Sequence, residues 1–209
     1  MSGVPSFSDA AEELTAIGRR FYARGWVFGT SGNFSAVVST KPLRLAITAS
    51  RAHKGRLTAG DILEIDDWGR VTDGQADSPS AETLLHIEIV KHCGARAVLH
   101  THSVWSTILS GRHAGEGGLA IEGYEMAKGL DGVTTHEHRE WIPIVENNQN
   151  MTRLATEMRE ALARVQGAHA FLICRHGLYT WGQTLADAER HVEILEFLFE
   201  TIGRGKGST

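Results

Sequence analysis

Hydrophobic residues follow two kinds of spacing along this chain of 209 residues. Where apolar residues recur every three or four positions, the pattern is typical of a helix with one buried face. This spacing predicts helices over residues 9–24, 80–92, 103–109, 151–165 and 184–202. Short apolar runs bounded by Gly, Asp or Pro are typical of strands. We expect strands over residues 33–38, 43–48, 62–66, 70–72, 95–102, 141–146, 168–174 and 178–181.

Polar residues at the edges of these segments predict where the helices begin. Side chains of Ser, Thr, Asp and Asn accept hydrogen bonds from the free N–H groups of a first helical turn. We therefore expect N-caps at Ser8 or Asp9, at Ser80, and at Thr184 or Asp187. The glycine-rich residues 111–118 are expected to form a loop.

The order of the elements favours an α/β fold. Strands in the middle of the chain, with helices at both ends and between them, favour a sheet covered by helices on two faces. Asp67-Trp68-Gly69 separates two predicted strands and is a hairpin signal, which implies antiparallel or mixed pairing. The length suits one domain, and no linker, low-complexity tract or repeat divides the chain. We expect a single domain over residues 1–209.

Composition excludes several classes of function. The net charge is −4 and the basic residues are scattered, so no surface for nucleic acid is indicated. The first residues lack the charged and apolar blocks of a signal peptide, and no apolar stretch approaches transmembrane length. Cys93 and Cys174 are expected to be free thiols in a reducing cytosol. These observations predict a cytoplasmic protein with neither membrane nor nucleic acid as a partner.

The segment His100-Thr101-His102 closes one predicted strand. Side chains alternate between faces along a strand, so both imidazoles point the same way and can bind one metal ion. His176 follows another apolar strand and precedes Gly177, where the chain must turn. Three histidines around one ion with an open position describe a catalytic site. The alternative is that these are hydrogen-bonded core histidines.

The other histidines are weaker candidates. His136-Glu137-His138 repeats the spacing, but it lies in a polar stretch that does not impose a common face, so we expect it at the surface. The remaining six are expected to be surface or core residues: His53, His113 and His169 near loops, and His86, His92 and His191 on helices.

Three carboxylates could accompany a metal. Glu82 lies in the first turn of a predicted helix, where a negative charge is common without any chemical role. Glu122 and Glu125 lie in residues 120–128, where each could be a surface charge on a short helix. An enzyme acting on a polyol nevertheless needs a proton acceptor and donor, and one carboxylate can serve as both.

Two turns could bind an anion. Gly29-Thr30-Ser31-Gly32-Asn33 enters the first strand, and Thr48-Ala49-Ser50-Arg51 leaves the second, with His53-Lys54-Gly55 close behind. Glycines, hydroxyls and backbone N–H groups at such turns can form anion-binding concavities. Each could equally be a plain turn. With Ser78 and Ser80 as a third wall, they predict a phosphate pocket.

Together these motifs resemble the class II aldolase/adducin family. The resemblance is carried, in family order, by residues 29–35, Ile47-Thr48-Ala49-Ser50, Pro79-Ser80-Ala81-Glu82, His100-Thr101-His102-Ser103 and Arg175-His176-Gly177. Two blocks, Tyr124-Glu125-Met126-Ala127-Lys128-Gly129 and residues 175–182, are similar to the dehydratase branch of that family.

The resemblance implies a three-layer α/β/α fold with a mixed, mainly antiparallel central sheet, in a homotetramer with active sites between neighbouring subunits. His100, His102 and His176 match the zinc ligands, one ion per subunit. Glu125 matches the acid/base carboxylate of the dehydratase branch, and Glu82 matches an aldolase carboxylate that can ligate metal or move protons. The residues that match the phosphate site are Ser31, Gly32, Asn33, Ser50 and Ser80. Family aldolases often have Ser-Ser-Glu where this chain has Ser80-Ala81-Glu82.

The activity that the resemblance implies is dehydration of 5-methylthioribulose 1-phosphate, a sugar phosphate, to 2,3-diketo-5-methylthiopentyl 1-phosphate in methionine salvage. The alternatives on the same scaffold are a sugar-phosphate aldolase and a pentulose-phosphate 4-epimerase. A non-catalytic, adducin-like interaction domain is the alternative of a different class. Histidine nitrogens suit zinc, with iron, cobalt, nickel and manganese as other candidates.

Overall fold

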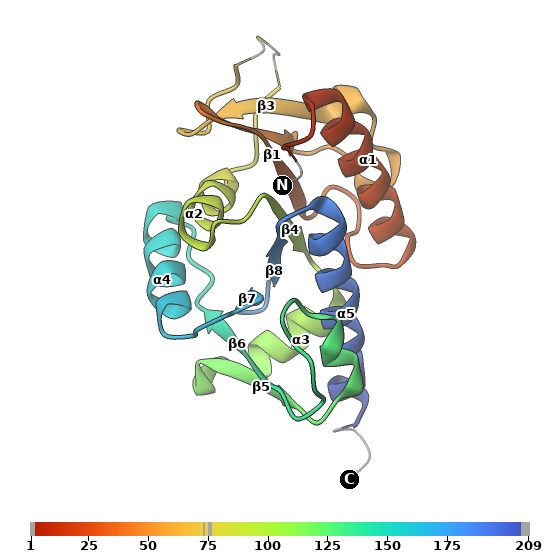
Figure 1. Ribbon diagram of the computed structural model, residues 1–209, viewed down its shortest axis with the longest axis vertical. Helices are drawn as coiled ribbons and strands as arrows, with labels where there is room; N and C mark the ends of the chain where they lie inside the picture. The colour runs from red at the N-terminus through yellow and green to blue at the C-terminus, as the bar shows by residue number, and fades with distance from the viewer. Residues whose placement is uncertain (1–2, 73, 75–76, 206–209) are drawn as a thin grey trace.

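The computed structural model describes residues 3–72, 74 and 77–205. An eight-stranded sheet runs through the molecule in the order β3-β2-β1-β4-β8-β7-β6-β5 (Figure 1). All neighbouring strands are antiparallel except β6 and β7, which are parallel. The strands are β1 (Asn33–Thr40), β2 (Leu43–Thr48), β3 (Ile62–Asp66), β4 (Ala97–Thr101), β5 (Gly118–Glu122), β6 (Arg139–Val145), β7 (Ala170–Ile173) and β8 (Gly177–Gly182).

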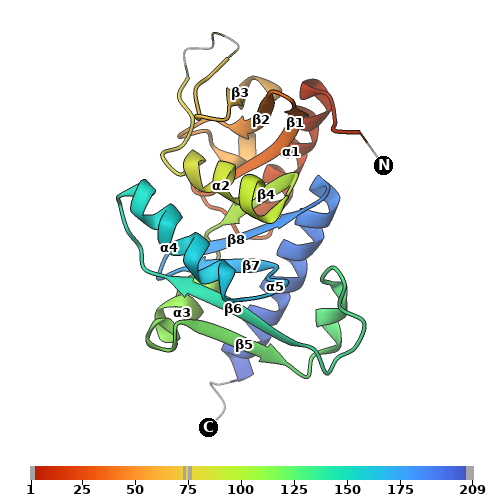
Figure 2. The same ribbon diagram turned by 60° about the vertical axis from the view of Figure 1, so that its left-hand side comes forward.

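Helices cover both faces of this sheet. They are α1 (Phe7–Ala23), α2 (Thr83–Cys93), α3 (Val104–Arg112), α4 (Met151–Ala163) and α5 (Leu185–Gly205). Helices α2 and α4 lie on one face, and α1, α3 and α5 lie on the other (Figures 1 and 2). The predicted three-layer α/β/α fold with a mainly antiparallel sheet is therefore confirmed. None of the described helices is long and apolar enough to cross a membrane.

The side chains of β4 alternate between the two layers of helices that cover the sheet. Ala97 and Leu99 pack against α1 and α5, while Val98 packs against α2 and α4. His100 has the same parity as Val98, so it lies on the α2 side, where it stacks on Tyr179 of β8 with ring centroids 3.9 Å apart. The strand therefore delivers an imidazole into the layer between the sheet and α2.

The helix starts differ from two of the predicted caps. Ser6, rather than Ser8 or Asp9, caps α1, because its Oγ accepts the N–H of Asp9 at 3.2 Å. Of the two residues predicted to cap α5, Thr184 is the cap, because its Oγ1 accepts the N–H of Asp187 at 3.1 Å.

Ser80 does not cap α2, because the helix begins at Thr83. The preceding residues run alongside the end of β2 instead, where Pro79 bridges to Ala49 and the Ser50 N–H donates to the Ser78 carbonyl at 2.9 Å. Glu82 therefore occupies the N-cap position rather than the first turn. This shift brings Ser80 and Glu82 next to the start of β1.

Two strand predictions were wrong. The hairpin predicted at Asp67-Trp68-Gly69 is present, and the Asp66 side chain closes its turn by accepting the N–H groups of Trp68 and Arg70. Residues 70–72 nevertheless pair with β3 through one bridge, between Val71 and Ile65, and do not form the predicted strand. Strand β5 falls where a glycine-rich loop and a short helix were expected. It pairs only with β6, and its Gly118 leaves room for the Trp141 ring, so little of its sequence signals a strand.

Candidate active site

Three imidazoles converge at one end of strands β4 and β8. His100 lies on β4, His102 follows it, and His176 lies in the turn between β7 and β8. The Nε2 atom of His102 lies 2.7 Å from that of His100 and 3.1 Å from that of His176. The structure therefore brings together the three histidines that the sequence spacing predicted as ligands.

The Glu82 carboxylate completes this cluster. Its oxygens lie 3.6 Å from His100 Nε2 and 3.3 Å from His176 Nε2. The four ligand atoms all lie within 4.8 Å of one another. Three nitrogens and one oxygen form a donor set that suits a divalent transition metal such as zinc.

The protonation of the histidines fits a metal site. Burial lowers the pKa of His102 to about 2, with the neighbouring histidines acting in the same direction. Burial also lowers the pKa of His100 well below its ordinary value. Both rings are therefore neutral at physiological pH, which leaves lone pairs free for a cation.

The ring of His100 is oriented by its other nitrogen. Its Nδ1 lies 2.9 Å from the carbonyl oxygen of Leu178, an acceptor, so Nδ1 donates and the lone pair resides on Nε2. The buried Tyr179 ring supports it from one side. Burial and the nearby Glu82 carboxylate raise the pKa of the Tyr179 hydroxyl, which is therefore protonated.

Gly177 allows His176 to reach the cluster. A Cβ at Gly177 would lie 2.1 Å from the Thr101 carbonyl oxygen, a distance at which atoms clash. We expect Gly177→Ala to push β8 away from β4 and to cost about 1–3 kcal/mol. Metal content and melting temperature of the purified variant would measure this. Gly115→Ala is the matched control, because a Cβ there meets no atom within 4 Å.

A hollow of about 230 Å³ opens beside the histidines. All five residues predicted to bind phosphate line it: Ser31, Gly32, Asn33, Ser50 and Ser80. Glu82 and His102 line the same hollow, so the predicted metal and phosphate sites adjoin. Gly32 is required here, because its φ is +75° and a Cβ would lie 2.6 Å from the His100 carbonyl oxygen.

Asn33 links the hollow to the metal cluster. Its Nδ2 donates to Glu82 Oε2 at 2.7 Å and to Ser80 Oγ at 3.3 Å. Its Oδ1 accepts from Nε2 of the buried His86, whose other nitrogen faces Ser35 Oγ at 2.8 Å. Burial lowers the pKa of His86 to about 4, so this ring is a neutral support that fixes the amide. Of the two places expected for His86, surface or core, the structure shows the core.

Lys54 is a site residue that the sequence pattern did not single out. Its side chain lines the same hollow, only 1% exposed, and Nζ donates to the carbonyls of Ala52 at 2.9 Å and Thr30 at 3.2 Å. Burial lowers the pKa of Lys54 to about 8, which still leaves a cation at neutral pH. Its turn was expected close to the pocket, but the residue itself gave no signal, because most lysines in turns are solvated.

Glu125 lies far from the histidines along the strands. Strand β5 ends at Glu122, opposite Arg139 at the start of β6. Strand β6 runs parallel to β7, and β7 ends at Ile173 opposite Gly177, which is the end that carries the histidines. Glu125 therefore follows the opposite end of the sheet, and one chain does not bring it to the metal cluster.

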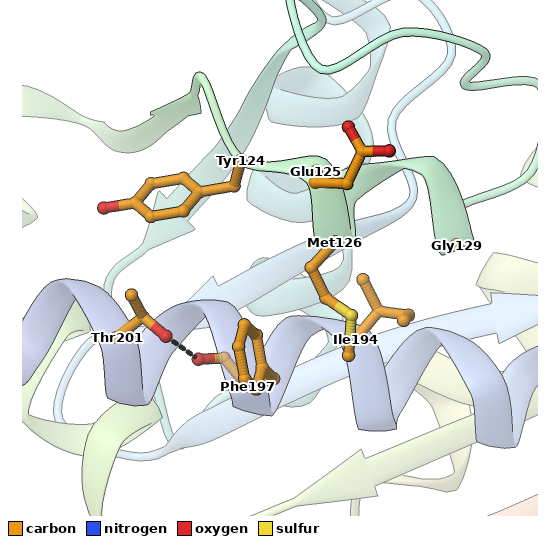
Figure 3. A pocket seen from close by; sticks show the side chains of 7 residues that line it. All are labelled: Tyr124, Glu125, Met126, Gly129, Ile194, Phe197 and Thr201. Atoms are coloured by element: carbon orange, nitrogen blue, oxygen red, sulfur yellow. Dashed lines mark hydrogen bonds between the residues drawn. The ribbon is translucent and has the colours of Figure 1, made fainter.

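The Glu125 side chain is 71% exposed and points away from α5 (Figure 3). Its carboxylate pairs with Lys128, which lowers the pKa of Glu125 and keeps it ionised, and it lies 4.0 Å from His136 Nδ1. It borders a hollow of about 480 Å³ between residues 124–129 and α5. The apolar side chains of Met126 and Phe197 line this hollow and are 38% and 48% exposed.

A comparison with protein families identifies the family to which the chain belongs. The family described as class II aldolase and adducin N-terminal domain matches residues 12–202. The chain belongs to this family. The resemblance inferred from the motifs is therefore confirmed, and the metal-site residues lie within the matched range.

Relatives within the class II aldolase/adducin family cover nearly the whole chain. The methylthioribulose-1-phosphate dehydratase of Methylococcus capsulatus is 48% identical over 202 residues, which are 96% of this chain and 96% of the relative. The dehydratase of Marinobacter nauticus is 44% identical, covering 96% of this chain and 95% of the relative.

Solved structures support the fold. An L-fuculose 1-phosphate aldolase superposes with a TM-score of 0.79 at 22% identity, covering 99% of this chain and 90% of that one. The L-fuculose-1-phosphate aldolase of Thermus thermophilus gives a TM-score of 0.71 at 24% identity, with 95% and 97% covered.

Proposed function

We propose that this chain is a metal-dependent hydro-lyase that removes water from 5-methylthioribulose 1-phosphate and forms 2,3-diketo-5-methylthiopentyl 1-phosphate. The observation that carries the proposal is the 48% identity, over 96% of both chains, to a methylthioribulose-1-phosphate dehydratase. The complete histidine cluster beside a polar hollow supplies the chemistry that such a reaction needs. The reaction belongs to methionine salvage, in a cytoplasm where Cys93 and Cys174 stay free.

We assign zinc to His100, His102 and His176, with Glu82 at the edge of the cluster. These residues would hold the ion, and a zinc ion bound there would supply Lewis-acid polarisation of the substrate carbonyl. Imidazole ligands carry no negative charge, so they would leave the positive charge of the ion available to the substrate. Glu82 is held in place by Asn33 and lies between the metal cluster and the phosphate hollow.

Proton transfer falls to Glu125 in this proposal. The ionised carboxylate takes the proton from C3, the C3–C4 double bond forms, and the C4 hydroxyl leaves as water with a proton returned by the same carboxyl. The resulting enol takes up a proton at C4 as its C3 hydroxyl loses one, which gives the 2,3-diketone. The balance is one water lost with no oxidant or reductant.

Glu125 reaches a metal cluster only across a contact between two copies of the chain, and we propose the homotetramer that the family resemblance implies. Exposed apolar side chains at both surfaces support such a contact: Met126 and Phe197 beside Glu125, and Val104 and Ile108 on the helix that follows His102. A contact between these two different surfaces would be heterologous, and in a closed tetramer four such contacts form a ring.

Lys54 gives the phosphate hollow its buried positive charge in this proposal. We expect Lys54→Met to raise the KM for the sugar phosphate roughly 10- to 100-fold, since a charge-assisted hydrogen bond is lost, and to change kcat less. Competitive inhibition by inorganic phosphate should weaken in parallel. Steady-state kinetics of Lys54→Met and of Lys91→Met, an exposed lysine, would measure this. An unchanged KM and phosphate inhibition in Lys54→Met would contradict the assignment.

Turnover with and without metal tests the proposed function. The purified protein should convert 5-methylthioribulose 1-phosphate, stop after chelation, and recover when zinc is restored. No turnover at full metal occupancy would contradict the proposal.

A further inference from the structure

The segment that carries Glu125 is tied to the sheet at Asp131. The main-chain carbonyl of Asp131 lies 2.7 Å from Nε2 of His169, and its N–H donates to Nε2 of His191 at 3.2 Å. Its carboxylate pairs with Arg190 of α5. Asp131 lies six positions after Glu125. It is thus held by three side chains: His169 beside β7, and Arg190 and His191 on α5.

Glu140 is a buried carboxylate that contacts the other ring nitrogen of His169, Nδ1. It lies on β6 and is 3% exposed. Its two oxygens lie 3.1 and 3.0 Å from His169 Nδ1, and one of them lies 2.7 Å from His138 Nε2. His138 belongs to the same segment as Glu125, so Glu140 holds the far end of that segment directly.

His169 stands between two groups that only accept hydrogen bonds. A backbone carbonyl and a carboxylate have no proton to give, so an imidazole that bonds to both must carry protons on both nitrogens. Burial alone would lower the pKa of His169, but the hydrogen bond and charge of Glu140 outweigh it and raise that pKa. Glu140 in turn has a lowered pKa, because His169 and His138 outweigh its burial.

The neighbouring charges fit this state. His191 packs 5.4 Å from the His169 ring, but its Nε2 accepts a hydrogen bond from the backbone and burial lowers its pKa, so it is neutral. Arg190 is neutralised by Asp131 and Asp187. Glu140 and Asp131 both raise the pKa of His169. His138 shares Glu140 Oε2 with His169, and the two ring centroids are 6.5 Å apart.

We infer that His169 is a positioning residue: as a cation it joins Glu140 to the Asp131 carbonyl and holds residues 124–138, and with them Glu125, in place. When His169 loses a proton, it can donate a hydrogen bond to only one of the two acceptors. The buried Glu140 carboxylate then also loses a positively charged neighbour. The segment is therefore held below the pKa of His169 and released as the pH rises through it. The catalytic consequence rests on the proposed function, whereas the anchoring does not.

Hydrogen exchange of the full-length, metal-loaded protein tests the anchor. We expect the protection factors of peptides within residues 124–138 to fall roughly tenfold as the pH rises through the pKa of His169, after correction for intrinsic exchange. His169→Gln donates to one partner only, so it should show the low protection at every pH. It should also lower kcat, with KM and metal content nearly unchanged. His92→Gln, an exposed histidine on α2, is the matched control.

A second variant guards against misfolding of the first. Glu140→Gln keeps the shape but removes the charge, so the pH at which protection falls should move downward. Protection that is independent of pH in the wild type, or equal in His169→Gln, would overturn the anchoring. Lost protection with unchanged kcat in His169→Gln, when Glu125→Gln is inactive, would overturn the positioning of Glu125. Failure of the proposed function is seen separately, as full turnover in Glu125→Gln, and the exchange data would still decide the anchoring.

Discussion

Glu125→Gln is expected to lower kcat roughly 10²- to 10⁴-fold, because a positioned carboxylate accounts for about that much of a proton-transfer reaction. The substitution keeps size and polarity and removes only the basic group. The metal ligands lie at the other end of the strands, so bound metal and KM should stay close to wild type. Glu122→Gln changes an exposed carboxylate three positions earlier and should keep full activity.

Mixing of inactive variants tests whether Glu125 acts across subunits. If each site combines the histidines of one copy with Glu125 of another, Glu125→Gln and His102→Gln chains can complement each other. Reassembly from equal amounts should restore activity at about one quarter of the sites in a ring of mixed chains. Absence of any recovery, with mixed oligomers demonstrated, would contradict a shared site.

His176→Gln is expected to abolish both metal binding and turnover. Removal of one of three nitrogen ligands weakens the site, and loss of a Lewis acid worth several kcal/mol corresponds to a fall in rate of roughly 10³-fold or more. Elemental analysis and steady-state kinetics on the same preparation would measure both effects. The matched control is again His92→Gln, which removes an exposed imidazole.

The melting temperature of the variant separates a chemical role from a structural one. His176 lies in a turn and its ring is partly exposed, so His176→Gln should fold. A folded variant with full metal content and full activity would show that His176 is no ligand.

The histidine cluster could be predicted from sequence because its geometry is local. Alternation along one strand places His100 and His102 on the same face, whatever surrounds them. His176 was harder to predict as a ligand, because its position beside the other histidines depends on β7, on β8 and on the close approach of Gly177 to Thr101. The phosphate residues also lie on turns at strand ends, where glycines and hydroxyls are easy to recognise.

The remainder of the site depends on long-range packing that the sequence pattern does not contain. Lys54 is a functional candidate only because folding buries its ammonium against two carbonyls. The separation of Glu125 from the histidines follows from strand order, in particular from β5, which the sequence did not reveal. The anchor formed by Glu140 and His169 joins residues 29 positions apart, each ordinary on its own.

Product analysis of the metal-loaded protein with 5-methylthioribulose 1-phosphate is the sharpest test of the proposed reaction, because dehydration and aldol cleavage start from the same substrate. We expect a single phosphorylated product that has lost one water and retains the methylthio group, formed only while metal is bound. Fuculose and ribulose phosphates should yield no comparable product. Cleavage between C3 and C4 into dihydroxyacetone phosphate and a methylthio aldehyde, or dehydration that survives complete removal of metal, would contradict the proposed reaction.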